Sequence, residues 1–318
     1  MTIGRLAPFA ASRVTPGAGS AVMGTAVLSE AFGLLSLDVL SLVLVAVAGL
    51  LWLLLAALFG YRLVGDRSLW RAEAELPTSL TAVAATCVLG SRVTLLGWHV
   101  LAGALLALGA VVWLALLPAV LRYWSVPTVG ASFLVCVCAE SVAVLAATIA
   151  LAAGVRWLVV AAAVAFLSGV LAYPFVLARF DFRQLRVGAG DHWVVGGALA
   201  SASLACAKLV TAAGTTPVPV RRAVDLALWA GAMCWTVVLV AVELRWPRPG
   251  FDGRRGSTVF VLSMTAFASL WVGQVEGVGA IRVVGEVLIW PAFALCVLVG
   301  YGVGYRALGS GRVLTDDR

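Results

Sequence analysis

Ten apolar stretches of membrane-crossing length recur along this chain of 318 residues, and they constrain its fold more than any other feature. Apolar residues make up 63% of the sequence and charged residues 12%, a balance that soluble domains do not show. Because a helix needs about 20 apolar residues to cross a bilayer, the sequence predicts an all-α integral membrane protein with ten transmembrane helices. The predicted spans are 17–35, 39–63, 79–96, 100–121, 129–152, 157–177, 192–212, 224–242, 258–272 and 283–305.

The placement of arginines favours this number of spans. With the N-terminus inside, the predicted cytoplasmic segments hold 16 arginines and the outer segments hold 5. Such an asymmetry over short loops is what the positive-inside rule requires. No secretory signal is expected, since residues 1–20 lack a continuous apolar core. The sequence predicts a multi-pass protein of the cell membrane, with a cytoplasmic segment 1–16, a membrane domain 17–305 and a cytoplasmic tail 306–318.

The predicted spans alternate in the size of their side chains. Gly, Ala, Ser or Thr fill 11 of the 21 positions of His192–Ala212, but only 6 of the 19 positions of Val224–Val242. Odd-numbered spans resemble the former, and even-numbered spans are rich in Leu, Val and Trp. We therefore expect five tandem helical hairpins, each with an inner small-residue helix and an outer apolar one, around a central pore. The alternative is that small residues only allow close packing of helices.

A few polar residues lie inside the predicted spans. Helical spacing puts Gly197, Ser201 and Lys208, the only lysine, on one stripe of the seventh span, as expected of a helix that lines a polar path. Glu140 lies near the middle of the fifth span, where a carboxyl group is either functional or packed and hydrogen-bonded to a neighbouring helix.

Lys208 shares its approximate depth with four other charged residues. Together they predict either a vestibule that attracts anions or a set of interhelical salt bridges. The four are Glu30, Arg92, Arg282 and Glu286.

Catalytic chemistry has little support in this sequence. The two histidines, His99 and His192, lie at span ends on opposite sides of the membrane and cannot share a metal ion. No nucleophile-elbow, zinc-protease or phosphate-loop pattern occurs, and the six cysteines lie within spans without metal-site spacing. We expect no enzyme activity, no metal and no cofactor. The net charge of +7 is explained by topology and does not indicate a nucleic-acid partner. A membrane-embedded enzyme or sensor remains a different class of hypothesis.

Four segments carry a resemblance to a known family. They are GDHWVVGGALASASLA at Gly190–Ala205, VMGTAVLS at Val22–Ser29, ATCVLGS at Ala85–Ser91 and VFVLSMTA at Val259–Ala266. These segments resemble helix motifs of the tellurite-resistance/C4-dicarboxylate transporter family, which belongs to the slow-type and voltage-dependent anion channel superfamily. The resemblance implies five tandem hairpins around a central pore, commonly assembled as a homotrimer. It also implies passage of small anions, C4-dicarboxylates or oxyanions such as tellurite.

The same resemblance implies particular site residues. A phenylalanine on the ninth helix occludes the pore of the family, and by motif position it is Phe260, although Val261 replaces the family's proline and Ser263 its glycine. The leading hypothesis is an anion-permeable channel or transporter, and the alternative is a proton-coupled anion carrier that uses Glu140. The residues predicted to line the pore are Gly24, Thr25, Thr86, Glu140, Gly197, Ser201 and Lys208.

Overall fold

The protein is all-α in the computed structural model, which describes residues 15–188, 190–214, 219–248 and 255–313. Across these residues the only β-type pairing is an isolated bridge between Thr128 and Phe180. The main helices are α2 (Gly19–Leu34), α3 (Asp38–Gly65), α5 (Thr81–Leu95), α6 (His99–Arg122), α7 (Leu134–Ala153), α8 (Trp157–Leu177), α10 (Val194–Ala213), α11 (Pro219–Arg245), α12 (Gly256–Val275) and α13 (Gly279–Val313).

Nine helical segments in the described part of the chain are long and apolar enough to cross a membrane. The helix that corresponds to the first predicted span, α2, has only 16 residues and follows a 3₁₀ turn at Pro16–Ala18. Ten crossings therefore remain a prediction, while nine are supported by length and composition. The short helices α4 (Arg67–Ala74) and α9 (Gln184–Val187) were not predicted.

Burial separates the helices into two groups. The most apolar window is 83% buried in Pro77–Leu95 and 94% buried in Gly130–Ala153, but only 11% buried in Asp38–Gly65. The small-residue helices are thus the inner ones and the Leu-rich helices are the outer ones, because small side chains allow helices to approach closely on every side.

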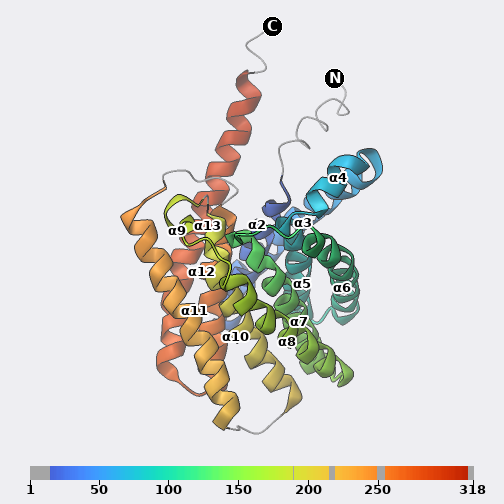
Figure 1. Ribbon diagram of the computed structural model, residues 1–318. Helices are drawn as coiled ribbons and strands as arrows, with labels where there is room; N and C mark the ends of the chain where they lie inside the picture. The colour runs from blue at the N-terminus through green and yellow to red at the C-terminus, as the bar shows by residue number, and fades with distance from the viewer. Residues whose placement is uncertain (1–14, 189, 215–218, 249–254, 314–318) are drawn as a thin grey trace.

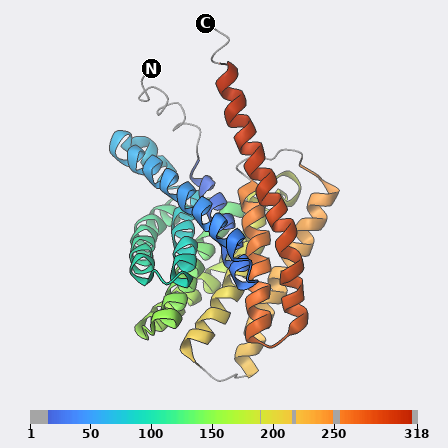
Figure 2. The same ribbon diagram turned by 180° about the vertical axis from the view of Figure 1, so that it is seen from behind.

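The five inner helices form a closed ring. Helix α2 packs against α5 and α12, α7 packs against α5 and α10, and α10 packs against α12. Each inner helix also packs against the outer helix that follows it in the chain, namely α3, α6, α8, α11 or α13. The outer helices surround the ring in the two opposite views of Figures 1 and 2.

The inner helices all begin at the same end of the ring. Short 3₁₀ turns precede α2, α5, α7 and α10, and successive turns contact one another. The approach is close, since a Cβ atom on Gly130 would overlap the backbone of Asp191, and one on Gly256 would overlap the Ser20 hydroxyl. The start of α2 and the end of α13 lie at this end of the bundle (Figures 1 and 2).

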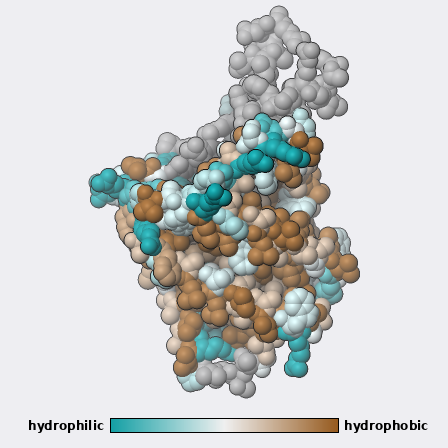
Figure 3. Space-filling view, turned by 45° about the vertical axis from the view of Figure 1, so that its right-hand side comes forward, coloured by the Kyte–Doolittle hydropathy of each residue, from teal (hydrophilic) through white to brown (hydrophobic). Residues whose placement is uncertain are grey.

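The outer helices present an apolar surface. Val39, Val100 and Leu114 are 79%, 91% and 68% exposed. Figure 3 shows an apolar band between two more hydrophilic ends. Such a surface is unfavourable in water and suited to lipid, so the chain is a multi-pass membrane protein.

The predicted terminal segments are only partly covered by the structure. Residues 1–14 of the predicted N-terminal segment lie outside the described residues. Helix α13 continues to Val313, so the predicted tail 306–318 begins within a helix, and residues 314–318 lie outside the described part.

Candidate functional site: the polar centre of the inner ring

Lys208 lies where the five inner helices meet. Its Nζ atom on α10 donates hydrogen bonds to Glu30 Oε2 of α2 at 3.2 Å, Ser91 Oγ of α5 at 3.1 Å and Thr148 Oγ1 of α7 at 3.0 Å. The side chains of Lys208 and Glu30 are each 2% exposed. Three acceptors match the three donors of an ammonium group, so this charge is buried with its hydrogen bonds satisfied.

Helix α12 completes the surroundings of this ammonium group with aromatic rings. Lys208 Nζ lies 5.3 Å from the ring centroid of Phe267 and 5.1 Å from that of Trp271. Both distances are in the range of cation–π attraction. Lys208 therefore contacts residues from all four of the other inner helices.

Arg92 lies beside this centre and adds a second positive charge. Its Nε–H group donates to Ser29 Oγ at 3.2 Å, and a Cβ atom on Gly33 would lie 3.0 Å from its Nη1 atom. The formal charges of Lys208, Arg92 and Glu30 sum to +1. The C-terminal ends of the five parallel helices carry negative partial charge and stabilise the two cations there.

The predicted grouping at this depth is partly present. Glu30, Arg92 and Lys208 come together, whereas Arg282 and Glu286 form their own exposed pair on α13, with 3.0 Å between Arg282 Nε and Glu286 Oε1. Glu30–Lys208 is an interhelical salt bridge of the kind given as the alternative, whereas Arg282–Glu286 is a pair within α13. Only the first of these pairs joins two helices.

Phe260 is 1% exposed and lies between two glycines of neighbouring inner helices. A Cβ atom on Gly197 would lie 3.1 Å from Phe260 Cε1, and one on Gly24 would lie 3.1 Å from the Phe260 backbone nitrogen. The stripe of Gly197, Ser201 and Lys208 therefore runs from the Phe260 ring to the buried ammonium group. The Ser201 hydroxyl is fully buried and has no hydrogen-bond partner among the described residues.

Two of the predicted pore residues direct their hydroxyl groups toward outer helices. Thr25 Oγ1 donates to Ala21 O at 2.8 Å and lies 3.8 Å from Cys296 Sγ of α13. Thr86 Oγ1 accepts a hydrogen bond from Trp52 Nε1 of α3 at 2.9 Å. A lining role for Thr25 and Thr86 stays a prediction that these contacts do not support.

Glu140 is fully buried on α7 and faces the outer helix α8. A Cβ atom on Gly169 of α8 would lie 2.8 Å from Glu140 Cγ and 3.2 Å from Oε1. Neither carboxyl oxygen has a hydrogen-bond partner in the part of the chain that the structure describes, so the alternative of a hydrogen-bonded acid is not supported. An unpartnered carboxyl group at membrane depth is costly to bury, which makes Glu140 a functional candidate.

A second polar cluster joins the starts of α10 and α12 to the end of α11. Arg248 donates to Gly188 O at 2.7 Å and lies 3.1 Å from His192 Nε2. Glu243 accepts hydrogen bonds from Arg248 and from Arg255, the latter at 2.7 Å. No group of three or more His, Cys, Asp or Glu residues able to hold a metal ion occurs among the described residues.

Sequence reasoning missed four residues around Lys208. Ser91, Thr148, Phe267 and Trp271 complete its surroundings, yet in sequence each is an ordinary small or aromatic residue of a membrane span. Their depth in the membrane was the available signal, because each of them lies in the second half of its inner helix, as Lys208 does.

Comparison with known families decides the class of this protein. The family model for voltage-dependent anion channels matches residues 13–303. The chain belongs to this family. The match spans all five inner helices and confirms the resemblance predicted from the helix motifs, and no curated protein gives a significant match. This member of the voltage-dependent anion channel family is accordingly a membrane protein for the passage of anions. Its family is one of channels and transporters, not of enzymes.

Proposed function

We propose that the inner ring conducts small anions past Phe260 and Lys208. The observation that carries this proposal is the buried Lys208 ammonium group, which contacts all four other inner helices, with Arg92 beside it. A net positive charge in a low-dielectric passage attracts anions and repels cations. We further propose chloride-sized anions, C4-dicarboxylates and oxyanions such as tellurite as the substrate classes to be tested.

We propose that Phe260 closes the passage. Its buried ring lies against Gly197 of α10, which leaves space for the ring, while Gly24 of α2 lies against the Phe260 backbone. An apolar constriction of this kind excludes ions because it removes their water without replacing it. The common direction of the five inner helices supports this proposal, and ten crossings arranged as five hairpins would produce that common direction.

The test is anion flux into liposomes that contain the purified protein. Phe260→Ala is expected to raise the flux of chloride or malate several-fold, because the smaller side chain reopens the constriction. Phe166→Ala, the same change on outer helix α8, is the matched control and should leave flux unchanged. Equal flux in wild type and Phe260→Ala would remove the gate, and no anion flux in either protein would reject the proposed function.

A proton-coupled carrier is the second candidate. The supporting observation is the fully buried Glu140 carboxyl group, which has no hydrogen-bond partner among the described residues. A group that can be neutral or charged at membrane depth can bind a driving proton. In this case anion uptake should change the internal pH of the vesicles, and Glu140→Gln should abolish the pH change. Uptake without any pH change in both proteins would leave Glu140 with a packing role.

We also propose that the protein assembles as a homotrimer. The exposed apolar outer helices offer surface both to lipid and to neighbouring copies. Native mass spectrometry of the purified protein should give a mass three times that of the chain.

A further inference from the structure

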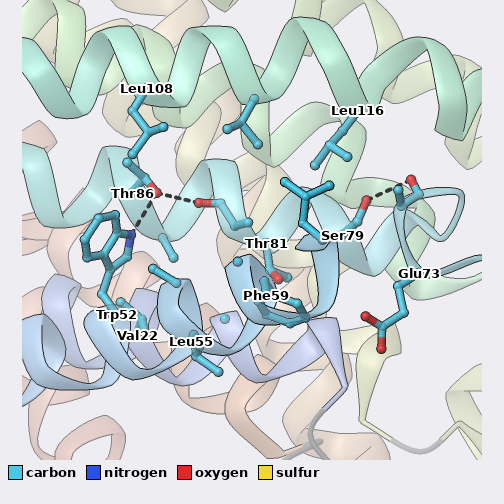
Figure 4. A pocket seen from close by; sticks show the side chains of 18 of the residues that line it. Val22, Trp52, Leu55, Phe59, Glu73, Ser79, Thr81, Thr86, Leu108 and Leu116 are labelled. Atoms are coloured by element: carbon cyan, nitrogen blue, oxygen red, sulfur yellow. Dashed lines mark hydrogen bonds between the residues drawn. The ribbon is translucent and has the colours of Figure 1, made fainter. Parts of the chain in front are cut away.

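A cavity of about 290 Å³ lies between the outer helices α3 and α6, away from the ring axis. Inner helix α5 forms its floor through Ala82, Ala85 and Thr86, and α4 covers one end (Figure 4). Three lining residues, Ala56, Gly60 and Leu63, are exposed, so the cavity opens on the lipid-facing surface.

The inner end of this cavity offers no free polar group to a ligand. The Thr86 hydroxyl accepts a hydrogen bond from Trp52 and donates one to Ala82 O at 2.7 Å, as Figure 4 shows. The walls between this end and α4 are formed by large apolar side chains. They are Leu55, Phe59, Leu63, Leu108, Val112 and Leu116. An occupant of this part must therefore be apolar, since a polar group would lose its hydrogen bonds to water without replacement.

The length of the cavity matches one leaflet of a bilayer. Its lining on α3 runs from Trp52 to Leu63, which is about 16 Å along a helix. Half of a hydrocarbon core of about 30 Å is about 15 Å. An extended acyl chain can fill the cavity over this length, whereas a compact polar solute would fill only part of it.

The α4 end of the cavity is polar and carries two arginines that have no ion-pair partner among the described residues. Glu73, which lines this end, accepts two hydrogen bonds from Arg62 Nη1, at 2.6 Å and 2.8 Å, so its charge is compensated. Arg67 and Arg71 are exposed on α4, one turn from the lining residues Trp70 and Ala74, and form no ion pair with another described residue. Arginines and a tryptophan at the end of a membrane helix are suited to phosphate headgroups.

We propose that this lateral cavity binds an anionic phospholipid, with one acyl chain along α3 as far as Trp52 and the phosphate group at Arg67 and Arg71. The site is separate from the ring axis and does not depend on the proposed anion path. It joins the lipid to α5 through Thr86 and Ala85, so the bound chain contacts a helix of the ring.

The experiment uses native mass spectrometry of the full chain, delipidated in detergent and titrated with phosphatidylglycerol or phosphatidylcholine. Gly60→Leu should fill the cavity, since a Cβ atom on Gly60 has no neighbour within 4 Å. We expect it to weaken phosphatidylglycerol binding about tenfold or more, because less acyl chain is buried. Gly49→Leu is the matched control on the same helix, outside the cavity and equally free of neighbours, and should bind as wild type does.

A second pair of variants tests the headgroup. Arg67→Gln with Arg71→Gln should remove the preference for phosphatidylglycerol over phosphatidylcholine and leave binding of the acyl chain. The proposal is overturned if Gly60→Leu and Gly49→Leu bind equally, or if wild type shows no preference between the two lipids. A change of oligomeric mass in Gly60→Leu with no change in lipid binding would identify a second copy of the chain as the occupant instead.

Discussion

At the scale of single residues, the Lys208–Glu30 pair shows how a charge can be kept inside a membrane bundle. The Nζ–Oε2 distance is 3.2 Å, and two hydroxyl groups satisfy the remaining donors of the ammonium group. Such a pair contributes little net stability compared with apolar residues, but removal of one partner leaves an uncompensated buried charge. The pair therefore keeps the Lys208 ammonium group charged inside the ring, and it makes α2 and α10 depend on each other.

This interdependence predicts a double-mutant result. Lys208→Met should lower the unfolding free energy by about 3–5 kcal/mol, because the Glu30 carboxylate is left buried without its partner. The double variant Lys208→Met/Glu30→Gln should recover much of that loss, since no charge remains at the pair. Thermal unfolding in detergent measures both effects. If the double variant loses more unfolding free energy than the two single variants lose together, the two residues do not interact as described.

At the scale of elements, α4 is a short helix whose position depends on its first turn. Asp66 precedes the helix, and its carboxylate accepts hydrogen bonds from the Leu69 backbone amide at 3.0 Å and from the Ser68 hydroxyl at 2.7 Å. These hydrogen bonds, the one from Leu69 first, hold the pKa of Asp66 below its ordinary value of 3.8. The cap is therefore strongest when the carboxyl group is ionised.

The lowered pKa gives a pH prediction with a definite sign. A carboxyl group with a depressed pKa in the folded state stabilises the helix above its unfolded pKa, and that contribution is lost as the pH falls through its folded pKa. Amide hydrogen exchange at residues 67–70 should therefore become faster, relative to the intrinsic rate, as the pH falls through 3.8 and further below it. Asp66→Asn should remove this pH dependence, because the amide caps the helix without titrating. An unchanged pH dependence in Asp66→Asn would assign the effect to another group.

At the scale of the whole molecule, parallel inner helices and an apolar outer surface define a membrane orientation. The inner helices begin at one end of the ring and the positive centre at Lys208 lies toward the other. The arginine distribution predicts that the helix starts face the cytoplasm. The fold and the charge pattern together give a direction that labelling can test.

Single cysteines at two exposed positions, one before α7 and one at its end, measure this orientation. Ser125 lies between α6 and α7, and Ala153 lies at the end of α7, before α8; both are exposed. A membrane-impermeant maleimide applied to intact cells should label Ala153→Cys and not Ser125→Cys. Wild type is the control, since its six cysteines lie within membrane helices. Labelling of Ser125→Cys alone would reverse the predicted topology.

The residue pattern along the chain was enough to predict the extent of most helices and which of them lie inside. Apolar length fixes where a helix can cross lipid, and small side chains fix which helices can be surrounded by others. The predicted span 157–177 has the same bounds as α8, and the small-residue span 192–212 became the buried α10. Both properties are local, so neither needs knowledge of the neighbours.

The direction in which each polar side chain points depends on how the helices pack against one another. Thr86 was expected in the pore and bonds instead to Trp52 of an outer helix, while Glu140 packs against Gly169 of α8. In a helix that is apolar on all sides, no amphipathic pattern fixes the rotation about its own axis, and successive residues differ in direction by about 100°. That rotation is set by contacts between distant helices, and for the same reason the three acceptors of Lys208, which come from three separate helices, could not be read from the chain.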